Sequence, residues 1–180
     1  MNNYLINLRR ALSHLDKARL KAICIVLAKT KKDSASIYLF GNGGSDALAS
    51  HMACDLSKRA GLRAFSLTAN SALVTAIAND LSFSDIFVKQ LEIYLDKKDV
   101  VIAISASGNS PNIIKAAIFA KKVGCKVIAL TGFMTGGTLA KIANIALVVE
   151  SNNYGVVEDT HLVVNHILTE TLSKVKTKDK

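Results

Sequence analysis

The chain has 180 residues, a formal net charge of +9 and 50% hydrophobic residues, a size that fits one domain over residues 1–180. Charged residues interrupt every apolar run before the ~20 residues of a membrane span, and no basic stripe is interleaved with aromatic residues, so we expect neither a membrane nor a nucleic-acid partner. The three cysteines, Cys24, Cys54 and Cys125, are widely spaced without a C-x-x-C pair, which indicates reduced thiols in a cytoplasmic protein.

Strands and helices alternate along the sequence. A helical apolar pattern predicts an N-terminal helical region at 1–32, and a basic tail is expected at 175–180. Between them the sequence predicts strands at 36–40, 63–67, 100–104, 126–130 and 145–149, and helices at 46–59, 73–78, 84–95, 111–123, 137–143 and 156–174. We therefore predict an α/β fold: a doubly wound, mostly parallel five-stranded sheet flanked by helices, with a helix at the N-terminus.

The stretch 99–111 carries the clearest functional signal. An apolar strand passes through a hydroxyl-rich turn into a helix whose first residue is Pro111, the only proline of the chain, with Ser110 as the expected cap. A helix N-terminus presents free N–H groups and a partial positive charge. The turn adds the hydroxyls of Ser105, Ser107 and Ser110, so the pattern predicts a site for a phosphate or another small oxyanion.

A glycine-rich turn follows the first strand, with the sequence Gly-Asn-Gly-Gly-Ser at 41–45. The carboxyl ends of parallel strands share one edge of the sheet, so this turn and the serine turn could face one ligand. A dinucleotide fingerprint is disfavoured because Asp46 stands at its third glycine position, and a P-loop sequence is absent. A turn with glycines for geometry alone remains the alternative.

Ionisable residues are spaced on two predicted helices. His51 and Asp55 are four residues apart, so they share a helix face, and the last helix carries Glu158, His161 and His166. Two histidines and two carboxylates suit a divalent metal such as zinc. The alternatives are a surface histidine–aspartate pair and, for His161, either a competing ligand or a hydrogen-bonded packing residue.

With these motifs the chain resembles the SIS (sugar isomerase) domains and, among them, the phosphoheptose isomerases. The resemblance covers nearly the whole chain and rests on residues 41–45, 51–55, 75–80, 104–111, 130–132, 136–137, 158–161 and 166. It implies the SIS fold and conversion of D-sedoheptulose 7-phosphate to D-glycero-D-manno-heptose 7-phosphate. It also implies a cytoplasmic homotetramer with sites between subunits, commonly with zinc.

The resemblance assigns roles to individual positions. It implies catalytic roles for Asp55 and His166. It implies one zinc ion per subunit, held by His51, Asp55, Glu158 and His166. The implied substrate contacts are Asn42, Gly43, Gly44, Ser45, Asp55, Asn79, Asp80, Ser105, Ala106, Ser107, Ser110 and Glu158. The chain departs from the family pattern at Asp55, Glu158 and Ala106, where Glu, Gln and Thr are usual.

An aldose–ketose isomerase of this kind transfers a proton through an enediol, which requires a carboxylate and a histidine close together. Two alternatives stay open: an enzyme acting on another phosphosugar, and a non-catalytic SIS regulator, for example one that binds the replication initiator. The leucine-rich face of the N-terminal helix is too long for one small sheet to cover, so we expect an oligomer interface there.

Overall fold

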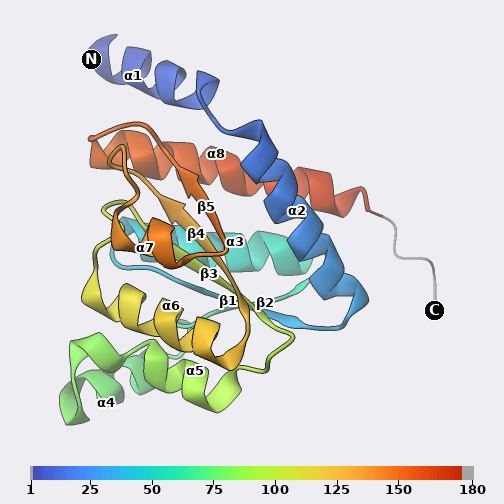
Figure 1. Cartoon of the computed structure of the whole chain (residues 1–180), viewed down its shortest axis with the longest axis vertical. Coiled ribbons are helices and arrows are strands. Elements are labelled where there is room, and N and C mark those ends of the chain that lie inside the picture. Colours follow the sequence, from blue (N-terminus) through green and yellow to red (C-terminus); the bar gives the residue numbers. More distant parts are fainter. Residues whose placement is uncertain (1, 176–180) are drawn as a thin grey trace.

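The computed structural model describes residues 2–175 and contains one five-stranded sheet in this range (Figure 1). All neighbouring strands pair in parallel, in the order β2-β1-β3-β4-β5. The strands are β1 (Ser36–Phe40), β2 (Arg63–Ser66), β3 (Val100–Ser105), β4 (Lys126–Thr131) and β5 (Ile145–Val148). The predicted parallel α/β sheet is therefore confirmed.

Helices cover both faces of the sheet (Figure 1). One face packs against α2 (Lys17–Lys32), α3 (Gly44–Lys58) and α8 (Tyr154–Ser173), and α1 (Asn2–Ser13) lies against α8. The other face packs against α4 (Ser71–Asp80), α5 (Val88–Tyr94), α6 (Pro111–Val123) and α7 (Gly137–Ile142), with the short 3-10 helix η1 (Phe83–Asp85) beside α4 and α6. Strands β1 and β3 contribute side chains to both cores, and nearly all of their residues are buried. This burial on both faces explains their continuous apolar sequences.

The chain leaves β1 toward β2 on one side and returns to β3 on the other, so strand order reverses between β1 and β3. Ligands of open α/β sheets bind at such a switch point, beyond the carboxyl ends of the strands. The glycine turn follows β1 and the serine turn follows β3, so the fold brings both predicted turns to this position.

Three details of the helices differ from the prediction. The predicted N-terminal helical region is confirmed, but it is divided into two helices at Asp16, whose side chain caps α2 by accepting from the Arg19 N–H. Asn79 and Asp80 lie beyond the helix predicted at 73–78 but form the last turn of α4, and the helix predicted at 84–95 is divided into η1 and α5. The division at Asp16 arises from a side-chain cap, which apolar periodicity does not report.

The basic tail expected at 175–180 lies outside the described residues except for Val175. Over the range 2–175, no helix is both long and apolar enough to cross a bilayer.

Candidate functional site

A cavity of about 200 Å³ opens at the switch point between β1 and β3. Its walls come from the glycine turn, the serine turn and the first turns of α8, which also supplies Tyr154. The predicted substrate-binding residues that line it are Asn42, Ser45, Ser105, Ala106, Ser107, Ser110 and Glu158. The structure thus brings together side chains from three separate segments of the chain.

The serine turn presents its hydroxyls to this cavity. Ser105 Oγ lies 3.5 Å from Ser110 Oγ and accepts the Gly108 N–H at 3.2 Å. Ser110 occupies the N-cap position of α6, as predicted, but its hydroxyl makes no capping hydrogen bond. That hydroxyl therefore stays available for an anion, beside the helix terminus.

A tight backbone contact holds the serine turn in place. Gly108 has a φ of +65°, and a Cβ there would collide with the carbonyl oxygen of Gly136. The Leu139 N–H donates to the Gly108 carbonyl at 2.9 Å, which joins the turn to the start of α7. Glycine is required here both for the backbone conformation and for the close approach of the two loops.

The glycine turn is fixed by a pair of amides. The Asn42 and Asn112 side chains each donate to the other's oxygen, at 3.0 and 2.9 Å, and Asn112 is 2% exposed. This pair connects the loop after β1 to the first turn of α6. A Cβ at Gly41 would lie 2.6 Å from the Ser45 carbonyl carbon, so only glycine allows α3 to begin this close to the strand.

Glu158 lies over Gly44 at the opposite wall of the cavity. A Cβ on Gly44 would overlap the Glu158 carboxylate, whose carbon would lie 2.6 Å away. The closeness of Gly44 allows α8 to place an anionic group within the cavity. A carboxylate only accepts hydrogen bonds, so Glu158 suits the hydroxyls of a sugar rather than its phosphate.

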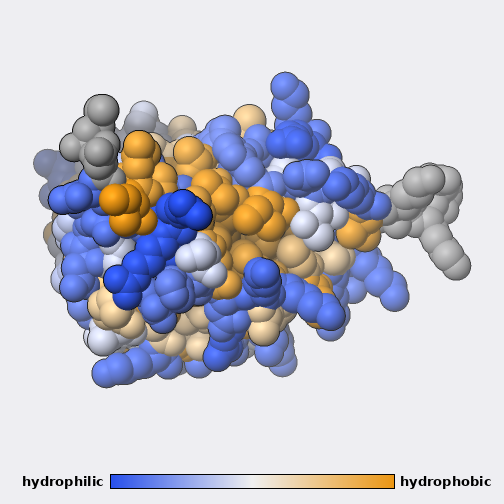
Figure 2. Space-filling model, turned by 90° about the horizontal axis from the view of Figure 1, so that it is seen from above, coloured by the Kyte–Doolittle hydropathy of each residue, from blue (hydrophilic) through white to orange (hydrophobic). Residues whose placement is uncertain are grey.

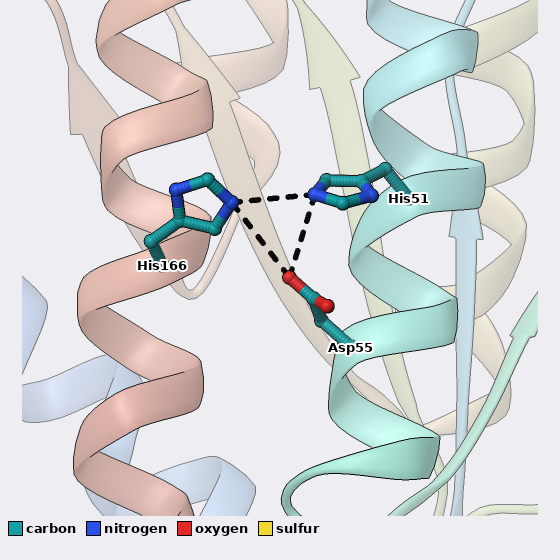
Figure 3. A group of neighbouring side chains, drawn as sticks. All are labelled: His51, Asp55 and His166. Atoms are coloured by element: carbon teal, nitrogen blue, oxygen red, sulfur yellow. Dashed lines mark hydrogen bonds and ion pairs between the residues drawn. The ribbon is translucent and has the colours of Figure 1, made fainter.

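Further along the same two helices, His51, Asp55 and His166 point toward one another (Figure 3). The Nε2 atoms of the two histidines are 3.3 Å apart, and Asp55 Oδ2 lies 3.5 Å from His51 Nε2 and 3.8 Å from His166 Nε2. The histidine side chains are half exposed, whereas the Asp55 side chain is 14% exposed. The three residues form an accessible group with a largely buried carboxylate.

These distances fit a zinc ion. Tetrahedral bonds of roughly 2.0–2.1 Å place ligand atoms roughly 3.3 Å apart, which is close to the separations in this group. Two imidazoles and one carboxylate leave a fourth position for substrate or water, as catalytic zinc sites do. Within the described residues, Glu158 is not part of the group, because its carboxylate lies over Gly44.

The two parts of the site are separated by a defined length of helix. His166 is eight residues beyond Glu158 on α8, which corresponds to about 12 Å along the helix axis. His51 is seven residues beyond Gly44 on α3, or about 10 Å. The anion cavity and the His–Asp–His group thus lie at successive levels of the same helix pair.

His161 is a packing residue, as one of the two alternatives predicted. It is fully buried, and its Nε2–H donates to the Thr131 carbonyl at 3.1 Å. Burial lowers the pKa of His161 to about 4, so the ring is neutral near pH 7. His161 therefore supports the end of β4 and does not compete for the metal.

Asn79 and Asp80 are not brought into this cavity. They lie exposed on α4, where the Asn79 amide donates to the Asp80 carboxylate at 2.8 Å. Sequence reasoning also missed three polar residues at the site: Tyr154, Asn112 and Asn165. The signal for Asn165 is an amide within an apolar helical run, directly before His166, because buried polar groups need partners.

Comparisons with known proteins agree with this architecture. Residues 2–132 match the SIS domain family. A phosphoheptose isomerase of Helicobacter pylori (strain P12) is 36% identical over 93% of this chain and 88% of that protein. A phosphoheptose isomerase of Thermodesulfovibrio yellowstonii is 38% identical over 87% of this chain and 80% of that protein.

A solved structure of phosphoheptose isomerase from Neisseria gonorrhoeae superimposes with a TM-score of 0.89 at 28% identity, over 97% of this chain and 95% of that one. The sequence match, the shared fold and the two-level site lead to the same assignment. The chain belongs to the SIS domain family and, within it, to the phosphoheptose isomerases.

Proposed function

We propose that this chain is an aldose–ketose isomerase that converts D-sedoheptulose 7-phosphate to D-glycero-D-manno-heptose 7-phosphate. One observation carries the proposal: a hydroxyl-lined anion cavity and a His–Asp–His group occupy successive levels of one helix pair. A protein that only binds a sugar phosphate needs the cavity but not the second group. The names of the relatives support the same substrate class.

The substrate phosphate is assigned to the serine turn. Ser105, Ser107 and Ser110 supply hydroxyl donors, and the N-terminus of α6 adds its partial positive charge. Asn42, held by Asn112, and the backbone around Gly43 and Gly44 contact the adjoining part of the sugar. Ser45, Ala106 and Glu158 complete the walls of the cavity.

The reaction is assigned to Asp55 and His166. Asp55 removes a proton from C1 of the ketose and returns it to C2 of the enediol, while His166 exchanges protons with the sugar oxygens. Within the described residues, only Oδ2 of Asp55 is engaged with neighbouring side chains, which leaves Oδ1 for the proton. The 3.8 Å separation of Asp55 Oδ2 and His166 Nε2 supports their joint action.

Zinc, one ion per subunit, is part of the proposal. His51, Asp55 and His166 would hold it and leave the fourth position to substrate or water, because the Glu158 carboxylate lies over Gly44 in the anion cavity. When bound, zinc would polarise the carbonyl and hydroxyl of the substrate and make the adjacent C–H more acidic. With a more acidic C–H, a weaker base at Asp55 and a weaker acid at His166 would suffice for the same proton transfer.

A homotetramer with sites between subunits also belongs to the proposal. Figure 2 looks onto the face that carries α1, α2 and α8 and shows a broad apolar region there. Large exposed apolar side chains on these helices are Leu5, Ile6, Ile25, Leu162 and Ile167. Burial of such a surface against other copies would stabilise the assembly. Asn79 and Asp80 lie on α4, which packs on the other face of the sheet, and for them the proposal is contact with the site of a neighbouring subunit.

The remaining assignments are a single SIS domain and a cytoplasmic location. Both helical layers pack on one sheet, which supports one domain. Cys24, Cys54 and Cys125, all within the described residues, are free thiols, and this suits a reducing compartment.

The test is an NMR assay of purified protein on matched ketose phosphates of five, six and seven carbons, together with metal analysis. We expect conversion of the seven-carbon substrate and about one zinc per chain. Conversion of only a shorter substrate would redirect the proposal to another phosphosugar. Binding of all three without any conversion would favour a regulator.

A further inference from the structure

Asn165 is a fully buried polar residue on α8, beside the His–Asp–His group. Its Nδ2 donates to Asp55 Oδ2 at 2.9 Å, and its Oδ1 accepts from the Thr169 hydroxyl at 3.3 Å. A carboxylate can only accept, so the amide must turn its NH₂ group toward Asp55. Both ends of the amide are therefore fixed, and its orientation is determined by its partners.

The oxygen that Asn165 contacts is the one that faces both histidines. Asp55 Oδ2 lies 3.5 Å from His51 Nε2 and 3.8 Å from His166 Nε2. Within the described residues, Asn165 is the sole neutral side chain that donates to this carboxylate. An aspartate side chain rotates about two bonds, so this contact restricts the direction of Oδ2 before any ligand arrives.

We infer that Asn165 is a positioning residue that orients Asp55 Oδ2 toward a metal ion shared with His51 and His166. Outer hydrogen bonds of this kind set the direction of metal ligands and add to metal affinity. The inference rests on the proposed function in its assignment of a metal to this group, and not on the identity of the sugar. Asn165 itself touches neither the metal position nor the anion cavity.

The first experiment measures zinc affinity by competition with a chromophoric chelator. Asn165→Leu keeps a similar side-chain volume and removes the donor, so we expect zinc binding to weaken by about 10- to 100-fold. The cobalt-substituted proteins should also differ in their visible absorption, because the carboxylate ligand is no longer held. Unchanged zinc affinity and an unchanged cobalt spectrum would overturn the inference.

Thr160→Val is the matched control. Thr160 is equally buried on the same helix, but its hydroxyl donates only to the Val156 carbonyl of its own helix, at 2.6 Å. We expect zinc affinity of this variant to equal that of the wild type. An equal loss in both variants would mean that buried polar residues of α8 act through helix stability and would overturn the positioning role.

A double-mutant cycle tests whether Asn165 acts through Asp55. In the Asp55→Ala background, Asn165→Leu should have no further effect on zinc affinity, since its partner is gone. An additional loss of the same size in that background would overturn the inference. Should Asn165→Leu fail to fold, Thr169→Val loosens the amide from its other end and should weaken zinc binding by a smaller factor.

Isomerase kinetics separate this inference from the proposed function. Asn165→Leu should lower kcat while KM changes little, because the serine turn is untouched. Zinc binding by the wild type without isomerisation of the heptulose phosphate would contradict the proposed function and leave the positioning role standing. No zinc binding by the wild type would overturn the positioning role.

Discussion

Acidification should destabilise the protein through His161. The ring is buried and neutral with a pKa of about 4, whereas the ordinary value of 6.5 applies in the unfolded chain. Below pH 6.5 the unfolded chain binds a proton at His161, whereas the folded protein leaves this ring neutral. The free energy of unfolding therefore falls as the pH falls. At pH 5, 1.5 units below the unfolded value, the loss attributable to His161 is about 2 kcal/mol at ~1.36 kcal/mol per unit.

Urea unfolding at pH 7 and pH 5 measures this effect. Other groups titrate in the same range, so the comparison is with His161→Gln, which keeps a donor for the Thr131 carbonyl. The wild type should lose about 2 kcal/mol more than the variant between the two pH values. Equal losses would refute the reasoning, as would a His161 pKa near 6.5 from an NMR titration of the native protein.

Three further predictions concern the site. Ser107→Ala should raise KM by about tenfold and leave kcat nearly unchanged, because it removes one donor to a charged phosphate; an unaltered KM in steady-state kinetics contradicts the phosphate role. Gly41→Ala should lower the free energy of unfolding in urea by about 1–3 kcal/mol, because the new Cβ meets backbone atoms. Gly44→Ala displaces only the flexible Glu158 carboxylate, so it should raise KM with little loss of stability. A larger loss of stability in Gly44→Ala than in Gly41→Ala would contradict this geometry. Asp55→Ala should abolish turnover while inorganic phosphate still raises Tm as in the wild type; turnover at the wild-type rate would remove Asp55 from the reaction.

The sheet was predictable because its central strands are continuous apolar runs that end in turn residues. Val100–Ser105 shows this most clearly, since every residue is buried and the serine turn follows at once. The division of the N-terminal region at Asp16 was not predictable from apolar periodicity, because a side-chain cap ends one helix pattern and begins another. The last turn of α4 was misassigned because Asn79 and Asp80 are residue types that favour turns, yet the helix continues through both and ends at Leu81, whose N–H donates to the Ile77 carbonyl.

The residue types of the candidate site were predictable, but its division into an anion cavity and a separate His–Asp–His group was not. A spacing of four residues on one helix predicts that His51 lies beside Asp55, and the structure brings the predicted ligand His166 to them from α8. Spacing along α8 could not show that Glu158 belongs to the anion cavity instead, because this depends on how closely Gly44 lets the two helices approach. The amides Asn112 and Asn165 were missed because their roles follow from partners far away in the sequence.

Reaction of D-sedoheptulose 7-phosphate in deuterated water tests the central claim most directly. A proton that passes between C1 and C2 through Asp55 exchanges with solvent, so the zinc-loaded protein should form the heptose 7-phosphate with deuterium at C2, seen by NMR. Asp55→Ala and His166→Ala should form none. Absence of the aldose product with the wild type, or its formation at an equal rate by Asp55→Ala, would contradict the account.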